Sequence, residues 1–132
     1  MYRVISIEDY MLTRNIRLEN SDTGTIDGCF DDSLLVSKKC FNFMKIGKKY
    51  NCKIKLFGEA VLDMQNHTLF CKVMEHNVII GATKMVKVLV ENDEYYIEQE
   101  KLENFIKMDS FYFRYSRKDL IQVNNIIHSD LL

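Results

Sequence analysis

Apolar and polar residues alternate one by one along several short segments, and this period of two constrains the fold more than any other feature. In "YNCKIKLFG" (50–58), the apolar side chains Cys52, Ile54 and Leu56 fall on one face and two lysines fall on the other. Successive side chains of a β-strand point to opposite faces, whereas a helix repeats every 3.6 residues. The pattern therefore predicts strands that pack one face against a core.

The same pattern recurs along most of the chain. It predicts strands over 2–10, 12–20, 25–32, 50–58, 68–74, 77–91 (broken near Gly81), 95–98 and 111–116. The segments "SDTG" (21–24) and "ENDE" (91–94) are typical of tight turns between antiparallel strands. The first thirty residues are thus predicted to form a meander whose second strand turns Leu12, Ile16 and Leu18 to the core, with Gly28 as a candidate β-bulge.

The period changes after residue 98. Leu102, Phe105 and Ile106 recur at the spacing of one helix face, and Leu120, Val123 and Ile127 form a second stripe of this kind. Ser116, followed three residues later by Asp119, fits a capped helix start. The sequence therefore predicts a helix–strand–helix extension over residues 99–132.

Together these segments predict an α+β protein. We expect a small, mostly antiparallel β-barrel, OB-like or similar, with a short helical C-terminal extension. The 132 residues include no proline and five glycines, so no linker-like segment divides the chain. This length fits one domain. We expect a single domain over residues 1–132, mainly β from about 1 to 98.

The cysteines and the N-terminal segment indicate a location. Cys29, Cys40, Cys52 and Cys71 form no C-x-x-C pair, which argues against a structural zinc site and favours free thiols in a reducing compartment. The N-terminal segment carries acids, unlike the apolar core of a signal peptide. No apolar run approaches the roughly 18 residues of a membrane span. The sequence predicts a cytoplasmic protein without a membrane partner.

No motif of a known catalytic chemistry is present. The chain lacks a nucleophile elbow, a phosphate-binding glycine loop and a dinucleotide fingerprint. His67 and Cys71 are four residues apart, but a strand would separate them by about 13 Å. His128 is predicted to cap or solvate a helix end. We therefore predict a non-enzyme with no catalytic residue, no metal and no cofactor.

Charge is segregated along the chain although the net charge is only −1. Residues 8–32 hold seven acids against two arginines, and residues 91–103 hold six acids against one lysine. Such segregation suits electrostatic recognition of a partner protein. We predict a binding protein that neutralises a partner, with a toxin or a nuclease as candidates, in the manner of toxin-immunity proteins or phage-type inhibitors. The predicted acidic face comprises Glu8, Asp9, Asp22, Asp27, Asp31 and Asp32 or, alternatively, the second segment with Glu91, Asp93 and Glu94.

Residues 38–58 support a rival prediction. They hold seven lysines, four aromatic residues and no acid. Single-strand nucleic-acid binders combine a basic groove with rings on which bases stack, and OB-like barrels often carry such grooves. The pI of 6.3 argues against this function, since dedicated nucleic-acid domains commonly exceed about 9. This alternative site comprises Lys38, Lys39, Lys45, Lys48, Lys49, Lys53, Lys55 and Tyr50.

A second basic and aromatic stretch is "FYFRYSRK" (111–118). Strand alternation predicts Tyr112 and Arg114 on the face opposite Phe111, Phe113 and Tyr115. The arginines are expected either to recognise phosphate or to pair with the acids of residues 91–103.

Overall fold

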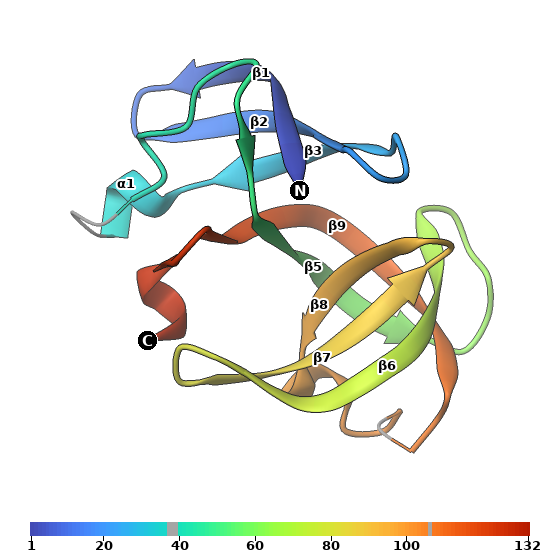
Figure 1. The fold of residues 1–132 in the computed structure, drawn as a ribbon. Helices are drawn as coiled ribbons and strands as arrows, with labels where there is room; N and C mark the ends of the chain where they lie inside the picture. Colours follow the sequence, from blue (N-terminus) through green and yellow to red (C-terminus); the bar gives the residue numbers. More distant parts are fainter. Residues whose placement is uncertain (37–39, 106) are drawn as a thin grey trace.

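The computed structural model describes residues 1–36, 40–105 and 107–132 and consists mainly of β-strands (Figure 1). Strands hold 61% of the described residues, and helix is scarce. The strands are β1 (Tyr2–Tyr10), β2 (Thr13–Asn20), β3 (Ile26–Asp31), β4 (Lys49–Tyr50), β5 (Cys52–Val61), β6 (Thr68–Ile80), β7 (Thr83–Val90), β8 (Asp93–Glu98), β9 (Ser110–Val123) and β10 (Ile126–Ile127). The helical segments are α1 (Ser33–Val36) and two short 3₁₀ helices, η1 (Gln99–Leu102) and η2 (Ser129–Leu131).

Five strands close into a barrel. β5 pairs with β8, β8 with β7, β7 with β6, β6 with β9, and β9 returns to β5. Every pairing in this ring is antiparallel except that of β5 with β8. The predicted barrel is thereby confirmed, and closure leaves its strands without a free edge.

The N-terminal meander attaches to the same two strands. β1, β2 and β3 pair in antiparallel order, and β3 pairs in parallel with β9 at Phe30 and Asp119. β1 also pairs with β4, which runs into β5 across Asn51. These pairings, with β4 running into β5, close a second ring that shares β5 and β9 with the barrel. In Figure 1 this meander lies above the barrel.

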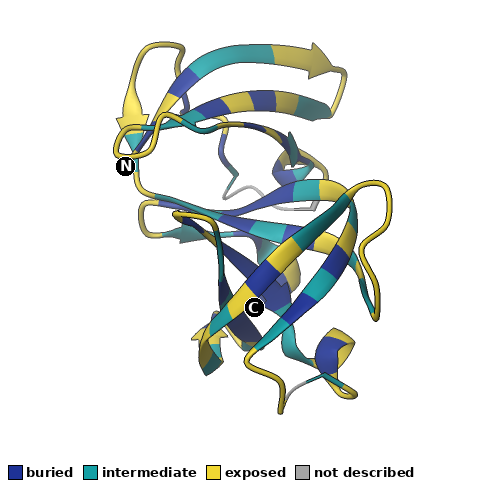
Figure 2. Ribbon diagram, turned by 90° about the vertical axis from the view of Figure 1, so that its right-hand side faces the viewer, coloured by how far each residue is buried: buried dark blue, intermediate teal, exposed yellow. Residues whose placement is uncertain are grey.

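One apolar core runs through both rings. Ile16 and Leu18 from the meander, Ile54 from the shared strands, and Ile97 and Phe113 from the barrel belong to the same buried cluster. Figure 2 shows buried and exposed residues alternating along these strands, as the period of two predicts. A smaller cluster outside the barrel contains Ile80, Met85, Tyr96, Ile121 and Leu131.

The predicted C-terminal helices are wrong. β9 continues through residues 116–123, so Ser116 and Asp119 lie in a strand and cap no helix. A β-bulge explains the misleading pattern: Leu120 pairs with Ile54 and Gln122 with Lys53, which leaves Ile121 as an extra residue. The extra residue brings Leu120 and Val123 to the same core, and their spacing of three imitates a helix.

The helix predicted around Leu102 and Phe105 is also much shorter in the structure. In the described part of this segment, η1 is the one helical element, with Leu102 buried and Phe105 packed against the core. Ile106 lies outside the described residues. The fold is therefore mainly β, and strand with two short 3₁₀ helices replaces the helix–strand–helix extension.

The predicted bulge at Gly28 is wrong as well, because β2 and β3 pair there without a register shift. A shift occurs instead between Phe57 and Gly58, opposite the Arg114–Arg117 stretch of β9. A Cβ atom on Gly58 would collide with the backbone carbonyl of Arg114. Gly58 therefore lets β5 and β9 approach each other at this bulge.

We predict opposite outcomes for the two glycines. Gly58→Ala should lower the free energy of unfolding by about 2–4 kcal/mol, because its new methyl group meets backbone that cannot rotate away. Gly28→Ala is the matched control, since no atom lies within 4 Å of the added Cβ and φ is not positive. It should leave stability within about 1 kcal/mol of the parent protein. Urea unfolding measures both, and equal losses would contradict the assignment.

Candidate functional site

The structure separates the predicted acidic residues into buried and exposed groups. Asp27, Asp31 and Asp93 are buried and accept hydrogen bonds from their own chain, so they do not contribute to a surface for a partner. The acidic face predicted from residues 8–32 is thus not continuous. The exposed members are Glu8, Asp9, Asp22, Glu91 and Glu94, whereas Asp32 is half-buried.

Asp27 joins the meander to the barrel. Its carboxylate accepts hydrogen bonds from the Tyr95 hydroxyl at 2.7 Å and from Lys118 Nζ at 2.6 Å. Lys118 also lies over the rings of Tyr95 and Tyr115, 5.5 and 5.2 Å from their centroids. Burial and the neighbouring Asp27 raise the pKa of Tyr95, so this phenol stays protonated and donates. One buried acid therefore connects β3, β8 and β9.

Asp31 organises the start of α1. It accepts hydrogen bonds from Arg14 Nη2 at 2.9 Å and from the Ser33 backbone N–H at 2.9 Å. Arg14 also donates to the carbonyl of buried Phe41 at 2.6 Å. The helix α1 begins at Ser33, two residues after this carboxylate.

Asp93 fixes the turn between β2 and β3. Its two carboxylate oxygens accept hydrogen bonds from the hydroxyls of Thr23 and Thr25, both at 2.6 Å. Asp93, which was predicted to lie on the alternative acidic face, therefore holds the meander against β8.

His128 is buried and bridges the C-terminal segment to α1. Its Nδ1 accepts the backbone N–H of Asp130 at 3.1 Å, which leaves the proton on Nε2, 2.6 Å from Asp32 Oδ1. The predicted capping role is confirmed for the 3₁₀ helix η2. Asp32, His128 and Asp130 form a group of close metal-ligand atoms. Because both ring nitrogens are already engaged, the group acts as a structural link in this conformation.

The described lysines of the predicted nucleic-acid site do not form one surface. Lys45, Lys48 and Lys49 are exposed along the segment beside β1, close to the half-buried Tyr50. Lys55 instead turns inward and contacts Glu98 at 3.1 Å and Asp119 at 3.8 Å. Lys53 lines a cavity between the meander and the barrel. Lys38 and Lys39 lie outside the described residues.

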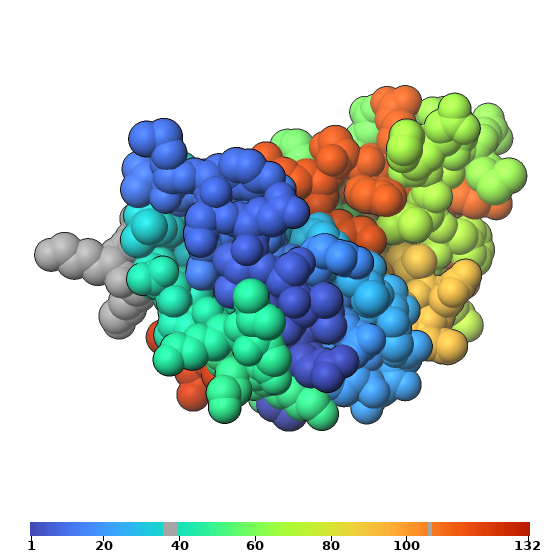
Figure 3. Space-filling view, turned by 90° about the horizontal axis from the view of Figure 1, so that it is seen from above, coloured from blue at the N-terminus to red at the C-terminus, as the bar shows by residue number. Residues whose placement is uncertain are grey.

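The alternation predicted for residues 111–118 is confirmed, with Phe111 and Phe113 buried and Arg114 exposed. The arginines do not pair with the acids of residues 91–103. Arg114 pairs with Glu59, and Arg117 pairs with Asp119. Arg117 also stacks near the rings of Phe30 and Phe57, 4.7 and 4.9 Å from their centroids. Figure 3 shows β9 (orange) between the meander (blue) and the β5–β6 segment (green).

The tip of the β1–β2 hairpin carries an exposed apolar group that the sequence analysis missed. Tyr10, Met11 and Leu12 are 53%, 99% and 50% exposed. Alternation predicted that Leu12 shares the core face of Ile16 and Leu18. This prediction is wrong, because Leu12 lies in the turn and is exposed. A run of three large side chains at a hairpin turn was the available signal, because such turns are normally polar.

The backbone at this tip is also unusual. Four hairpins have two-residue loops, and in each the first loop residue has a positive φ: Met11 (53°), Gly81 (63°), Glu91 (54°) and Asn124 (52°). Glycine and asparagine adopt this conformation most easily. Met11 is the one large apolar residue among the four. Turn geometry does not explain its presence.

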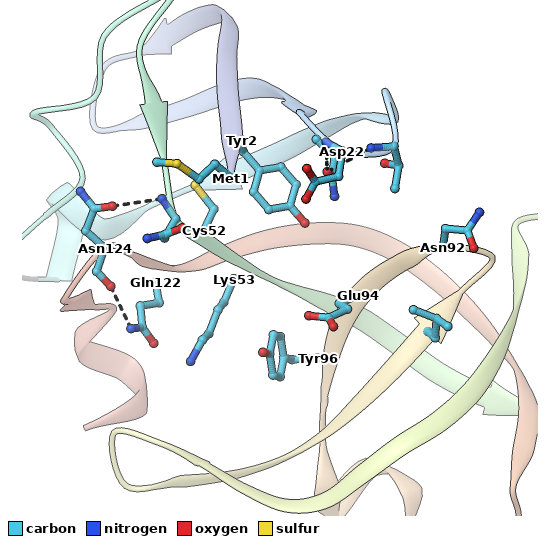
Figure 4. A pocket seen from close by; sticks show the side chains of 14 residues that line it. Met1, Tyr2, Asp22, Cys52, Lys53, Asn92, Glu94, Tyr96, Gln122 and Asn124 are labelled. Carbon is cyan, nitrogen blue, oxygen red and sulfur yellow. Dashed lines mark hydrogen bonds between the residues drawn. The ribbon is translucent and has the colours of Figure 1, made fainter.

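A cavity of about 430 Å³ lies between the meander and the barrel (Figure 4). Its lining is mostly polar and comes from β1, the β2–β3 turn, the start of β5, the β7–β8 hairpin and the end of β9. Figure 4 shows Lys53, Gln122 and Asn124 on one side and Asp22, Asn92 and Glu94 on the other. The lining residues are Met1, Tyr2, Asn20, Asp22, Thr23, Asn51, Cys52, Lys53, Leu89, Asn92, Glu94, Tyr96, Gln122 and Asn124.

Comparison with known proteins gives no family: no family model, no curated protein and no solved structure matches the chain significantly. Among the residues that the structure describes, no helix has the length and apolar character needed to cross a membrane.

Removing the buried carboxylate should destabilise the protein strongly. Asp27→Asn leaves Lys118 without its charged partner, and we expect the free energy of unfolding to fall by about 3–5 kcal/mol. Tyr95→Phe removes only a hydroxyl and should cost about 1–2 kcal/mol. Glu19→Gln breaks the exposed pair with Arg3 and serves as the control, with an expected loss below about 1 kcal/mol. Urea unfolding compares the three, and a similar loss for Asp27→Asn and Glu19→Gln would refute the role of Asp27.

The predicted free thiols are present, and most are shielded. Burial raises the pKa of Cys52 and Cys71 to about 12 and that of Cys29 well above its usual value. Near pH 8 a disulfide reagent should therefore modify the half-buried Cys40 first and the others only after unfolding. Cys40→Ser should remove the fast phase, and persistence of that phase would contradict the prediction.

The thiols of Cys29, Cys52 and Cys71, whose pKa is raised by burial, predict a pH dependence of stability. In the unfolded chain they ionise near about pH 8.5, whereas the folded protein keeps them protonated. Stability is therefore fully present below that pH and falls as the pH rises towards 12. Urea unfolding as a function of pH measures the loss.

Proposed function

We propose that the protein binds another protein through its hairpin-tip surface, defined as Glu8, Asp9, Tyr10, Met11 and Leu12, and blocks that partner. The observation that carries the proposal is the exposed Tyr10–Met11–Leu12 run in a turn that favours glycine at the position of Met11. Residues that conflict with the local backbone preference, as Met11 does at this turn position, are often found at functional sites.

The composition of this surface supports a protein partner. Binding sites between proteins place apolar and aromatic anchors at the centre, with a polar rim around them. Burying one large apolar side chain contributes about 1.5–3 kcal/mol. Met11 and Leu12 project from the end of the hairpin, a shape that suits insertion into a cleft of the partner.

The charge beside the tip supports a basic partner. Glu8 accepts a hydrogen bond from the Tyr10 hydroxyl at 2.6 Å, which holds both side chains at the surface. Arg14 lies across from Asp9 in the pairing of β1 and β2, but its charge is matched by buried Asp31. The tip therefore offers two uncompensated carboxylates, which favour fast association with a positively charged surface.

Further apolar residues enlarge the surface at the same end of the meander. Leu34 and Leu35 of α1 are exposed, and α1 contacts β2. Figure 1 places α1 and the β1–β2 turn at one end of the molecule. A stable interface buries about 800 Å² on each partner, more than a single hairpin tip provides. Leu34 and Leu35 extend the apolar area towards this size.

A protein that occludes a partner in this way belongs with toxin-immunity proteins or phage-type inhibitors in type, and we propose that it acts in the cytoplasm without catalysis. We also propose that the barrel is OB-like, because OB-folds are five-stranded and partly closed. The rival function, nucleic-acid binding, has as support the exposed Lys45, Lys48 and Lys49, which form no ion pair among the described residues.

We predict that Met11→Gly combined with Leu12→Ser separates binding from folding. Glycine adopts the positive φ of Met11 freely, so stability should stay within about 1 kcal/mol of the parent protein. Loss of both anchors should weaken the complex by roughly 10- to 100-fold. The measurement is recovery of a stoichiometric complex from the native host, followed by affinity determination with the purified partner.

The matched control is Leu62→Ser with Met64→Ser. These side chains are 81% and 76% exposed in the connection between β5 and β6, so the change removes equal apolar surface elsewhere. A complex lost equally in both variants, or retained in both, would refute the assignment to the tip. Binding to single-stranded DNA that disappears between about 50 and 200 mM salt, and after Lys45, Lys48 and Lys49 are changed to Glu, would favour the rival function.

A further inference from the structure

We propose that the cavity between the meander and the barrel binds a small organic oxyanion, with its charged group held by Lys53 and Tyr96 and its hydroxyl-bearing body held by neighbouring amides. This binding site is independent of the hairpin-tip surface, because the two share no residue. Its volume of about 430 Å³ lies within the range of about 300–1,000 Å³ that is common for small-molecule sites.

Tyr96 provides a hydroxyl donor that faces the cavity. Most of the residue is buried, with 7% exposed, but its hydroxyl is open to the cavity and forms no hydrogen bond with a described residue. The buried hydroxyl of Tyr95, by contrast, donates to Asp27. Burial raises the pKa of Tyr96, so the hydroxyl remains protonated and available to donate at neutral pH.

Lys53 provides an uncompensated cation beside this hydroxyl. Its Nζ lies 5.7 Å from the centroid of the Tyr96 ring, and no described carboxylate lies within ion-pair distance. The half-buried lysines Lys55, Lys87 and Lys118 each contact an acid. Lys53 alone among these lacks one, so an anion in the cavity would supply its partner.

The amides next to Lys53 are held in fixed positions. The backbone N–H of Asn51 donates to Asn124 Oδ1 at 3.0 Å, and Gln122 Nε2 donates to the Asn124 carbonyl at 2.9 Å. Gln122 is also the cross-strand neighbour of Lys53. Gln122 Oε1 and Asn124 Nδ2 are left to pair with ligand hydroxyls, since amides offer both donors and acceptors.

The far side of the cavity limits the charge of the ligand. Asp22 and Glu94 line that side, opposite Lys53, Gln122 and Asn124 in Figure 4. Carboxylates there would repel a second anionic group but accept hydrogen bonds from hydroxyls. The lining therefore fits a ligand with one oxyanion at one end and a neutral polyol body. A carboxylate and a phosphate monoester share this chemistry.

Three probes with similar bodies test the proposal on the full chain: glucose 6-phosphate, gluconate and glucose. In ¹⁵N-resolved NMR titrations, we expect at least one of the two anions to shift the amide signals of Lys53, Gln122 and Asn124, and glucose to do so far more weakly. A response to both anions supports a general oxyanion site. A response to one of them identifies the phosphate or the carboxylate.

Variants assign the response to the proposed residues. Lys53→Met should weaken binding of the effective anion by roughly 10- to 100-fold, and Tyr96→Phe by roughly 10-fold. Lys48→Met is the matched control at an exposed lysine outside the cavity and should leave the affinity unchanged. If Lys53→Met does not fold, Lys53→Gln keeps a polar side chain of similar length and should show the same loss.

Three outcomes of the titrations would overturn the proposal. The first is no shift with either anion. The second is equal binding of glucose, and the third is a response confined to Lys45, Lys48 and Lys49, which would mark screening of exposed lysines. Unchanged affinity in a folded Lys53 variant would also overturn it.

Discussion

The pairing of β5 with β9 is the constraint on which the rest of the structure depends. These two strands belong to both rings, so one ladder of hydrogen bonds holds the barrel and the meander together. The ladder contains two bulges in β9, one at Ser116, opposite Phe57 and Gly58, and one at Ile121. Bulges increase the local twist of a strand, which suits a sheet that must curve into two closed rings.

Ion pairs between distant strands determine which charged side chains are left without an opposite charge and can bind a partner or ligand. Asp27 from the acidic N-terminal segment meets Lys118 from the C-terminal strand, and Asp31 meets Arg14 within the meander. Both acids are buried, where an unpaired carboxylate would be very costly. The segregation of charge along the chain is thus largely cancelled in space. Uncompensated charge remains at a few places, such as the hairpin tip and Lys53.

The two proposed sites lie in different parts of the structure. The hairpin-tip surface lies at an end of the meander, whereas the cavity lies where the meander faces the barrel. A protein partner at the tip and a small anion in the cavity would therefore not compete for the same residues. Each site contains a group whose main interaction the described residues do not supply: the exposed side chain of Met11 at the tip has no apolar cover, and the ammonium of Lys53 in the cavity has no carboxylate partner.

The sequence by itself determined most of the strands and several turns, because alternation and turn residues are local features that act over only a few positions. Their number and order also predicted a barrel. It predicted the core faces of Ile16, Leu18, Phe111 and Phe113 correctly. Only the tertiary structure decided the rest. The bulge at Ile121 gave a strand the spacing of a helix, since the extra residue is visible only when β9 pairs with β5. The burial of Asp27 also could not be predicted from its neighbours in sequence. It depends on Tyr95 and Lys118, which are 68 and 91 residues away in the chain and donate hydrogen bonds to its carboxylate.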